Sequence, residues 1–410
     1  MDFGRSARRR PNPAWEMPVR LAIFVDQVFW RDGDVMSTDE SYVLFLASFL
    51  DEVDEIVLIG RLAPEPGRAP YLLGNPAIRL CPLPYYPNLY ELWRHGPGIY
   101  RRTIATVRRE ATGQWDALLV CGPHPLGQLI ARQCSRFGIP VALIVRQNLI
   151  QQMDAHRGLK RLAALAAATL LEWDFKRLAR GRTVFTVGTE MAEEYARFTG
   201  HVHNHFPCLV DDGQFRAFSA MPAGADPARL LCVCRLAPEK GHVFLFDALV
   251  QLRERGVAFH LDLVGIGALE AELKGRARAM GIEDAVTFHG YVPYGPELLH
   301  LYQEAGVMVL SSLTEGFPQV INESLSIGIP TVATTVGGIP AFLADGQTAL
   351  LVPPRDPAAL AAALERAIND QVLRQGLRER GRALMSANTL EANRSKVMGA
   401  IRHEVLAACA

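Results

Sequence analysis

The amino-acid sequence predicts an α/β fold with two doubly wound, Rossmann-like domains. Short apolar segments typical of buried strands alternate with helical patterns along most of the chain. Such alternation is typical of parallel sheets that are covered by helices on both faces. The alternation stops near residue 207 and begins again near residue 229. Because 410 residues are enough for two or three domains, we expect a domain boundary at this interruption.

The N-terminal domain is expected over residues 19–207. Residues 1–18 are rich in arginine and proline and lack a following apolar segment, so they predict a disordered tail and not a signal peptide. The Ser-Thr-Asp-Glu sequence at 37–40 resembles a capping box that opens a helix over 42–50. The segment from His201 to Asp212, with Pro207, predicts the linker. Strands are predicted over 20–26, 55–60, 78–83, 117–121, 141–145 and 183–187, and a long helix over 158–180.

The C-terminal domain is expected over residues 208–388. The last helical segment, 389–410, either belongs to this domain or packs back on the N-terminal one. The sequence RLAPEPG at 61–67 is echoed by RLAPEKG at 235–241, which fits two similar folds or chance similarity of loop chemistry. Strands are predicted over 229–235, 259–264, 285–288, 307–310 and 330–333, and a helix over 241–255.

Composition limits the kinds of partner. The formal net charge is zero, whereas a dedicated nucleic-acid-binding protein usually has a basic excess. From Arg94 to Arg182 there are 15 Lys and Arg against 5 Asp and Glu. This excess indicates either a face that meets an anionic membrane or acceptor, or an ordinary solvated surface. The apolar run at 162–171 is too short to cross a bilayer and predicts either a membrane-surface helix or a core helix, and its alanines favour the core.

The cysteines and histidines predict no metal cofactor. Seven cysteines without regular spacing indicate reduced thiols and therefore a cytoplasmic protein. Peripheral binding to the inner face of a membrane is compatible with this location. Cys232 and Cys234 alternate in an apolar run and should share one face of a strand. His201, His203 and His205 also alternate, which is more typical of an extended linker than of a metal site. No Asp-x-Asp or His/Cys ligand set is evident.

Candidate binding residues lie after the strands of the second half, where parallel sheets bind ligands. Arg235 and Lys240 follow the first strand and precede a helix, which suits a diphosphate, or they are solvated surface charges. The next strand is followed by Gly265-Ile266-Gly267, but Glu270 replaces the last glycine of a dinucleotide fingerprint. A turn in which the backbone approaches a phosphate or sugar is compatible with these glycines.

The strongest pattern follows the strand predicted at 307–310. Glu315 lies in a turn, Gly316 permits close backbone approach, and Pro318 suits the first turn of a helix. Glu323 lies on an otherwise apolar stretch of that helix, and a buried carboxylate requires a partner. Ligand hydroxyls would be suitable partners. In the alternative interpretation Glu315 caps the helix and Glu323 pairs with a neighbouring arginine.

The segment EGFPQVINESLSIGIPTVATTVGGIP, with its E-x7-E spacing, closely resembles glycosyltransferase family 4, as do RLAPEKG, LDLVGIGALEAEL and FHGYVP. The resemblance is strong over about 229–360. It implies the GT-B fold, with two Rossmann-like domains facing across a cleft, and transfer of a sugar from a nucleoside-diphosphate-sugar to an acceptor hydroxyl with retention of configuration. The acceptor would be a small molecule, a lipid or a glycan.

The resemblance also implies roles for single residues. Arg235 and Lys240 would neutralise the diphosphate, and Glu323 would bind the ribose hydroxyls. Glu315 and the amides near Gly316 and Phe317 would hold the donor sugar, and Pro318 would belong to the same donor-binding segment. Gly290, Tyr291 and Val292 would lie by the base, and His124 would lie near the reaction centre. Fixed cations and amides would stabilise the leaving diphosphate without a divalent metal, and the departing phosphate would accept the proton.

The first half departs from the family pattern in three places. The loop at 30–34 has one glycine, Gly33, where two are usual, Arg146 stands where a histidine is common, and 208–211 replaces an Asn-Gly-Val-Asp sequence. These departures bear on the acceptor and on the diphosphate contact expected from Gly33. The competing functions are a sugar-nucleotide epimerase, a non-catalytic sugar-nucleotide or glycan-binding protein, and a nicotinamide-dependent oxidoreductase. A turnover assay separates the transferase from a binding protein.

Overall fold

The computed structural model describes residues 18–146, 159–219 and 226–407. These ranges leave out residues 1–17, which form most of the expected N-terminal tail. They also leave out Gln147, Asn148 and Arg157. The chain divides into two compact parts, here named unit 1 and unit 2. Unit 1 comprises Met1–Pro207 and Asn393–Ala410, and unit 2 comprises Cys208–Ala392.

Unit 1 is built on a sheet whose parallel strands lie in the order β5-β3-β1-β6-β7-β8-β9. The strands are β1 (Arg20–Asp32), β3 (Glu55–Leu62), β5 (Ile78–Leu83), β6 (Ala117–Gly122), β7 (Val141–Val145), β8 (Val184–Thr186) and β9 (Val202–Asn204). Chain order therefore runs outward in one direction from β1 to β5, and in the other direction from β6 to β9. The reversal between β1 and β6 is the point at which such sheets bind ligands.

The second half of β1 forms an antiparallel hairpin with β2 (Val35–Thr38), and β2 pairs in turn with β4 (Tyr71–Leu73). Gly33 occupies the hairpin turn with a φ of 60°, a conformation that favours glycine. The predicted capping box is therefore wrong: Thr38 donates from Oγ1 to the Val28 carbonyl, and Ser37 accepts from the Ala69 amide. The following helix α1 (Tyr42–Ala47) begins without a side-chain cap. The hydroxyls of Ser37 and Thr38 are therefore hydrogen-bonded to backbone groups and do not cap the helix.

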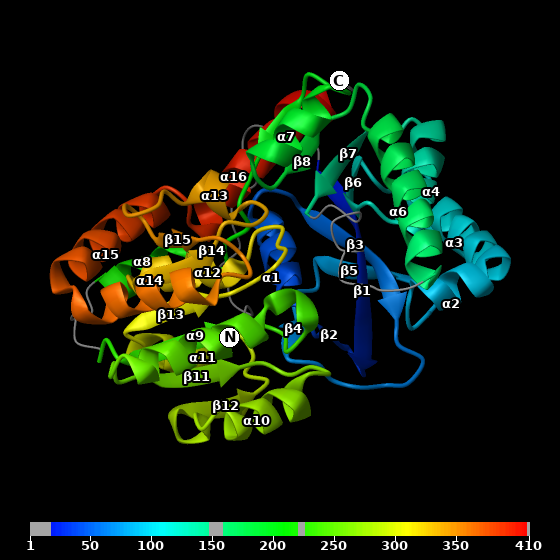
Figure 1. Ribbon diagram of the computed structural model, residues 1–410. Helices are drawn as coiled ribbons and strands as arrows, with labels where there is room; N and C mark the ends of the chain where they lie inside the picture. Colours follow the sequence, from blue (N-terminus) through cyan, green and yellow to red (C-terminus); the bar gives the residue numbers. More distant parts are fainter. Residues whose placement is uncertain (1–17, 147–158, 220–225, 408–410) are drawn as a thin grey trace. The chain divides into compact units, whose positions relative to one another are not determined.

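The helices of unit 1 are α1, α2 (Leu89–Arg94), α3 (Gly96–Ala111), α4 (Pro125–Arg136), α6 (Leu159–Leu178) and α7 (Thr189–Ala196). Figure 1 shows α2, α3, α4 and α6 gathered at one side of the sheet. Helix α6 covers the predicted long helix, but the preference for a core helix is wrong because Leu170 and Trp173 are 65% and 54% exposed. Its inward face is formed by residues such as Phe175 and Leu178.

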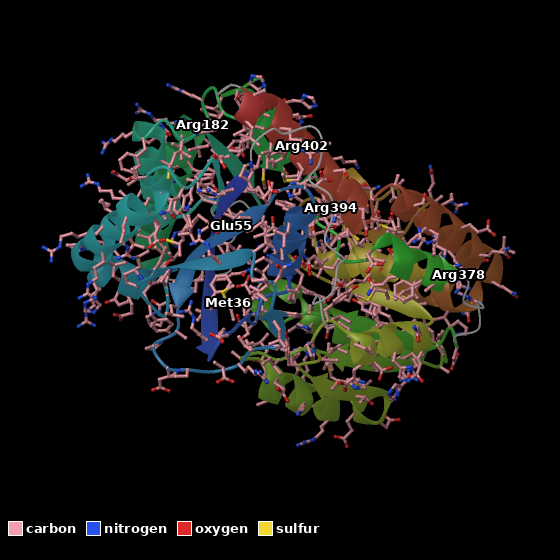
Figure 2. All side chains as sticks on the ribbon, turned by 180° about the vertical axis from the view of Figure 1, so that it is seen from behind. Met36, Glu55, Arg182, Arg378, Arg394 and Arg402 are labelled. Atoms are coloured by element: carbon pink, nitrogen blue, oxygen red, sulfur yellow. The ribbon has the colours of Figure 1, made fainter. Side chains whose placement is uncertain are left out.

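The C-terminal segment completes unit 1. Helix α16 (Leu390–Ala400) continues into the π-helix η4 (Ile401–Leu406), and from Asn393 onward this segment belongs to unit 1. Arg394 Nη1 lies 2.5 Å from Asp51 Oδ2, and Arg402 pairs with Glu52. Figure 2 labels both arginines on this segment. These ion pairs join the last helices to the loop that precedes β3.

The alternating histidines belong to strand β9 and its flanks, so the linker predicted to begin at His201 is wrong in its first half. His203 Nε2 lies 2.8 Å from Glu404 Oε1, and His201 Nδ1 lies 3.5 Å from Glu404 Oε2. His205 is buried, and burial lowers the pKa of its imidazole to about 4. The alternation therefore reflects a short strand that pairs with β8.

Unit 2 contains a six-stranded parallel sheet, within the described residues, in the order β12-β11-β10-β13-β14-β15. The strands are β10 (Arg229–Val233), β11 (His260–Val264), β12 (Val286–Gly290), β13 (Val307–Leu310), β14 (Thr331–Thr334) and β15 (Leu350–Val352). Its helices are α8 (Asp212–Ser219), α9 (His242–Glu254), α10 (Glu270–Ala279), α11 (Pro296–Glu304), α12 (Gln319–Ile327), α13 (Ile339–Phe342), α14 (Pro357–Asn369) and α15 (Gln371–Ser386).

Both faces of the unit 2 sheet are buried. Leu230 and Cys232 of β10 pack into one apolar cluster, and Leu231 packs into the cluster on the opposite face. This alternation explains why β10 has a continuous apolar sequence: a parallel strand buried on both faces exposes neither of its side-chain rows to water. The reversal of strand order lies between β10 and β13, which places the loops after these two strands at the centre of the sheet edge.

Candidate functional site

The centre of the unit 2 sheet edge holds a buried ion pair. Lys240, in the loop after β10, donates from Nζ to Glu315 Oε1 at 2.6 Å, and Glu315 lies in the loop after β13. Ser312 Oγ donates to the same oxygen at 2.6 Å. The side chains of Lys240 and Glu315 are 14% and 6% exposed. An ion pair with so little water around it is a strong local electrostatic feature, and it lies where ligands of such sheets bind.

The backbone fixes the relative position of the two loops. Ser311 Oγ donates to the Lys240 carbonyl at 3.0 Å, and the Leu313 amide donates to the Glu239 carbonyl at 2.7 Å. Gly241 has a φ of 66°, and a Cβ at this position would lie 2.2 Å from the Ser311 carbonyl oxygen. Only glycine fits between these loops, so the Lys240–Glu315 pair is held by rigid main-chain contacts.

Arg235 does not join this pair. Its guanidinium pairs with Glu239 at 2.9 Å, and its side chain is 75% exposed. The sequence predicted that Arg235 and Lys240 act together on one diphosphate, but the structure gives each cation its own carboxylate. Arg235 lies at the surface, whereas Lys240 is buried among the loops.

Glu323 on helix α12 is buried, as the sequence predicted, but its partner is Tyr302. The Tyr302 hydroxyl donates to Glu323 Oε2 at 2.6 Å. The alternative interpretation, in which Glu323 pairs with a neighbouring arginine, is therefore wrong. Burial raises the pKa of the Glu323 carboxyl to about 7, and the hydrogen bond from Tyr302 lowers it only in part. A group with this pKa changes charge near neutral pH.

The segment between these carboxylates packs tightly on the neighbouring loop. The Gly316 carbonyl accepts from the Gly338 amide at 2.7 Å, and a Cβ on Gly337 would lie 1.9 Å from the Glu315 carbonyl oxygen. The ring of Phe317 packs edge-on against Phe342, with centroids 4.8 Å apart. Pro318 occupies the cap position of α12, one residue before the first turn in which it was predicted.

The glycines after β11 are explained by close backbone contact. A Cβ on Gly265 would lie 1.9 Å from the Cys234 carbonyl oxygen, and one on Gly267 would lie 2.2 Å from that of Leu236. Their packing against the loop after β10 accounts for the Gly-x-Gly sequence without a dinucleotide.

The three residues that were expected beside the base differ in their surroundings. Gly290 has a φ of 72°, and its carbonyl accepts from the Gly265 amide at 2.8 Å. The side chain of Tyr291 is 46% exposed, whereas Val292 is buried in the apolar cluster that includes Tyr302. Of this trio, Tyr291 offers the accessible aromatic surface on which a base can stack.

Unit 1 has its own polar cluster at the corresponding point of its sheet. Asp26 lies where the pairing of β1 with β3 is irregular, and His124 follows β6. Tyr86 donates to Asp26 Oδ1 at 2.5 Å, Arg61 Nε lies 3.0 Å from the same oxygen, and His124 Nε2 lies 3.3 Å from Asp26 Oδ2. Burial would raise the pKa of Asp26, but the hydrogen bond and attraction of His124 and the charge of Arg61 lower it to about 2.

Both ring nitrogens of His124 have partners. Nδ1 accepts from the Leu126 amide at 3.2 Å, so it caps helix α4 and is unprotonated, while Nε2 faces Asp26 and Tyr86. The side chain is only 7% exposed. His124 therefore orients the Asp26 carboxylate through Nε2. The sequence predicted His124 but missed Asp26, Arg61 and Tyr86, although a carboxylate and an arginine at the ends of two successive strands were visible signals.

A second group that the sequence analysis missed lies beside Lys240. Cys232 and Cys234 share one face of the strand end as predicted, with their sulfurs 3.7 Å apart, and Cys234 Sγ lies 3.3 Å from His242 Nε2. Together the three residues could hold a metal ion. The C-x-C-x7-H spacing was the available signal, but its meaning depended on the turn that brings His242 back to the strand.

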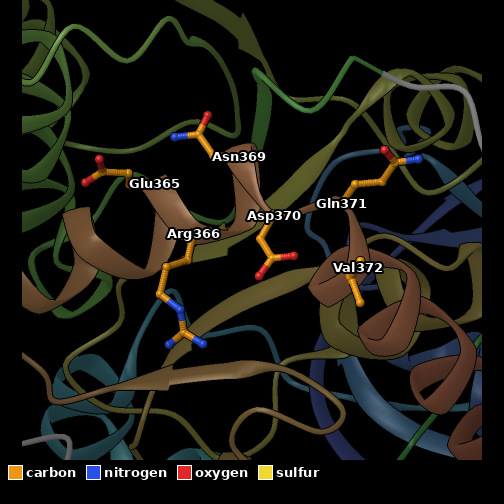
Figure 3. A pocket seen from close by; sticks show the side chains of 6 residues that line it. All are labelled: Glu365, Arg366, Asn369, Asp370, Gln371 and Val372. Atoms are coloured by element: carbon orange, nitrogen blue, oxygen red, sulfur yellow. The ribbon is translucent and has the colours of Figure 1, made fainter.

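Two surface hollows lie in the described parts of the chain. Figure 3 shows one at the junction of α14 and α15, lined by Glu365, Arg366, Asn369, Asp370, Gln371 and Val372. The other is in unit 1 and follows β3 and β5, with Leu62, Leu83 and Tyr85 on one side and Arg102 and Arg109 of α3 on the other. The second hollow is at the carboxyl ends of two strands.

Comparison with known proteins finds similarity to a family over most of the second unit. Residues 216–384 match the family described as Glycosyl transferases group 1. The amylovoran biosynthesis glycosyltransferase AmsK of Erwinia amylovora is 34% identical over 146 residues, which are 34% of this chain and 36% of AmsK. The chain matches about two fifths or less of the length of the first such curated relatives.

Solved structures resemble nearly the whole chain. Sucrose-phosphate synthase from Thermosynechococcus elongatus has a TM-score of 0.72 and 22% identity, with 96% of this chain and 100% of that chain covered. Anabaena HepE in complex with UDP-glucose has a TM-score of 0.66 and 16% identity, with 93% and 99% covered. These likenesses show that the chain has the GT-B fold with two Rossmann-like domains. Within the described residues, no helix combines the length and apolar character needed to span a membrane.

Proposed function

We propose that this protein is a retaining glycosyltransferase of family 4 that moves a sugar from a nucleoside-diphosphate-sugar to an acceptor hydroxyl. The observation that carries the proposal is the buried Lys240–Glu315 pair at the strand-order reversal of unit 2. The pair lies within the residues that match Glycosyl transferases group 1. A cation and a carboxylate, both shielded from water, offer one group for a diphosphate and one for sugar hydroxyls.

Donor binding would exchange one set of contacts for another. In the structure Lys240 is neutralised by Glu315. A diphosphate oxygen would compete for the Lys240 ammonium, and a hydroxyl of the donor sugar would donate to Glu315 in its place. The exchange leaves neither group without a hydrogen-bonding partner, because each leaves one partner only when another arrives. The backbone amides near Gly316 and Phe317 would supply further donors to the sugar.

The transition state places growing negative charge on the diphosphate. Lys240 is held by main-chain contacts of its loop, so it can stabilise that charge without reorganising. The cation supplies the positive charge for which a divalent metal is often used, and we propose transfer that does not require one. In a retaining reaction the departing phosphate oxygen would take the proton of the acceptor hydroxyl.

Glu323 would bind the ribose. Its carboxyl already accepts from Tyr302, and a second oxygen is available to accept from a hydroxyl. A ribose hydroxyl donating to Glu323 would favour the ionised form, so nucleotide binding would lower its pKa from about 7 and release a proton near neutral pH. Tyr291 would stack on the base.

The acceptor would be held by unit 1. The hollow after β3 and β5 is lined by Arg102 and Arg109, which suits an acceptor with an anionic group, whether a small molecule, a lipid or a glycan. Helix α6 exposes Leu170 and Trp173 beside Arg177, whose guanidinium lies 4.6 Å from the Trp173 ring centroid. An exposed apolar and basic helix of this kind suits peripheral contact with an anionic membrane from the cytoplasmic side.

The donor is tested first by thermal shift with UDP, GDP, ADP and TDP, each without and with magnesium. A ligand that binds only the folded protein at about a hundred times its Kd adds about 2.7 kcal/mol to stability. We expect one nucleotide to raise Tm without magnesium, and Lys240→Ala to abolish the shift. Lys274→Ala is the matched control, because Lys274 pairs with Glu270 at the surface of the same unit.

Turnover then separates an enzyme from a binding protein. The sugar nucleotide whose base gives the shift is incubated with the protein, and release of free nucleoside diphosphate is measured. Release in wild-type protein and its loss in Lys240→Ala supports the transferase. A thermal shift without any release, over a panel of acceptors, would instead support a non-catalytic sugar-nucleotide-binding protein.

A further inference from the structure

We propose that Cys232, Cys234 and His242 form a zinc site in unit 2. The two cysteines lie at the end of β10, and His242 is the first residue of α9. All three ligand atoms lie within 4.8 Å of one another. The site itself does not depend on the proposed function, and only its effect on the Lys240 loop does.

The distances match those of a tetrahedral ion. Zinc binds cysteine sulfur at about 2.3 Å and histidine nitrogen at about 2.0–2.1 Å, so tetrahedral angles place two sulfurs about 3.8 Å apart and a sulfur and a nitrogen about 3.6 Å apart. The observed separations are 3.7 Å between the Cys232 and Cys234 sulfurs and 3.3 Å between Cys234 Sγ and His242 Nε2, and the Cys232 and His242 ligand atoms lie within 4.8 Å of each other. An ion fits among these atoms with small side-chain adjustments.

The donor set selects the kind of ion. Two thiolates and an imidazole are soft to intermediate ligands that suit zinc, whereas magnesium and calcium require oxygen ligands. Cys232 and His242 are each 1% exposed, so the site is shielded from water. The buried Nδ1 of His242 has no partner among the described residues, and the ring instead directs Nε2 to the sulfur of Cys234.

Rigid elements present the ligands. Cys232 is in a strand paired on both sides, and the Cys234 amide donates to the Val264 carbonyl at 3.0 Å. His242 follows Gly241, whose backbone lies against Ser311. Three protein ligands leave the fourth tetrahedral position for water or another small ligand. Preorganised ligands bind more tightly because less conformational entropy is lost on binding.

The ion would also affect the neighbouring loop. Cys234 and His242 flank residues 235–241, the loop that carries Lys240. Zinc would cross-link the two ends of this loop, and with two thiolates it would add no net charge beside the Lys240–Glu315 pair. If the proposed function is correct, the ion thus fixes the position of the lysine that binds the diphosphate.

Metal content is the direct test. Tag-free full-length protein is reduced, incubated with zinc, passed through gel filtration and measured by elemental mass spectrometry. We expect about one zinc per wild-type chain, and a loss of at least 80% or so in the Cys232→Ser/Cys234→Ser double variant and in His242→Ala. Cys134→Ser is the matched control, because Cys134 is buried in the core of unit 1. Zinc-free wild-type protein, or equal zinc in the double variant, would overturn the site.

Cobalt substitution keeps the test valid if a variant does not fold. Wild-type protein loaded with Co²⁺ should show thiolate-to-metal charge-transfer absorption and strong visible bands of a tetrahedral ion. Absence of these bands, or a Cys232–Cys234 disulfide in the freshly purified protein, would overturn the proposal. Thermal shift with nucleotides is measured in parallel. Zinc without nucleotide binding would contradict the proposed function alone, and nucleotide binding without zinc would contradict the zinc site alone.

Discussion

Each unit places a carboxylate and a nitrogen-bearing partner at the same topological position, but in exchanged order. In unit 1 the carboxylate of Asp26 belongs to the first strand, and His124 follows the fourth parallel strand. In unit 2 the cation of Lys240 follows the first strand, and the carboxylate of Glu315 follows the fourth. The shared sheet order brings the ends of these strands together, while the side chains determine which loop carries the negative charge.

The carboxylates of Asp26 and Glu315 also differ in the partners that surround them. Asp26 has Arg61, Tyr86 and His124 around it, and these partners come from three different segments of unit 1. For Glu315 the structure shows Lys240 and Ser312. We infer that the cluster around Asp26 in unit 1 fixes a local structure. In unit 2, by contrast, a ligand that contacts both Lys240 and Glu315 can separate the pair.

The largest effect is expected from breaking the unit 2 pair. Lys240→Ala should lower kcat for sugar transfer by about 10²- to 10³-fold, because a preorganised charge at the leaving group is lost. Steady-state release of nucleoside diphosphate measures the change, with Lys274→Ala as the control. A rate within threefold or so of wild type would show that Lys240 does not contact the diphosphate.

The buried Glu323 gives unit 2 a characteristic dependence on pH. Its carboxyl has a pKa of about 7 in the folded protein, whereas an ordinary glutamate has a pKa of 4.5, so the unfolded chain ionises first as pH rises. Its contribution to stability is present below pH 4.5 and is lost by about pH 7, with a total of about 3 kcal/mol.

Glu323→Gln should flatten this decline, because an amide does not ionise. Urea midpoints of the variant and wild type across the same pH range test the expectation, with Glu379→Gln on the exposed face of α15 as the control. Parallel curves for wild type and Glu323→Gln would mean that Glu323 ionises normally.

Asp26 in unit 1 should show the opposite sign. Its pKa of about 2 lies below the pKa of 3.8 of an ordinary aspartate. Its contribution to stability is therefore present above pH 3.8 and is lost as pH falls toward 2. The linked free energy is about 2 kcal/mol. Acid unfolding of Asp26→Asn, followed by circular dichroism, should lack this component. If the variant and wild type lose stability equally over that range, Asp26 does not depend on His124 and Arg61 as its geometry indicates.

The smallest effect is expected from Arg235→Ala. The side chain is exposed and pairs with Glu239, and exposed pairs of this kind contribute about 0–1 kcal/mol. We expect kcat within about threefold of wild type and little change in Tm. A loss as large as that of Lys240→Ala would mean that Arg235 moves onto the diphosphate when the donor binds, and would restore the paired-cation site that the sequence predicts.

The strands that the sequence predicts best are those with uninterrupted apolar runs. The predicted bounds of β7 and β13 equal the observed ones, because burial on both faces leaves no polar residue within these strands. By contrast, β2 and β9 are short strands with polar side chains, and they were missed. Ser37 and Thr38 illustrate the difficulty, since the same hydroxyls suit a helix cap and a hairpin.

The sequence predicts which loops carry the site residues, but it does not predict which of these residues contact one another. The positions of Lys240 and Glu315 after strands were clear from local sequence. Their 2.6 Å contact joins residues 75 positions apart and follows from strand order, which the sequence does not display. The repeated RLAPE sequence shows the same limit. Arg61 lies near the end of β3 in unit 1 and is largely buried against Asp26. Arg235 follows β10 in unit 2 and is exposed.

The return of the C-terminal segment to unit 1 has a consequence for synthesis on the ribosome. Arg394 and Arg402, the partners of Asp51 and Glu52, emerge only after all of unit 2 has been made. At about 5–20 residues per second, this delay is on the order of ten seconds or more. Unit 2 is continuous in the chain and can fold as it emerges, whereas unit 1 is completed only when the last-made helices bring Arg394 and Arg402 to Asp51 and Glu52.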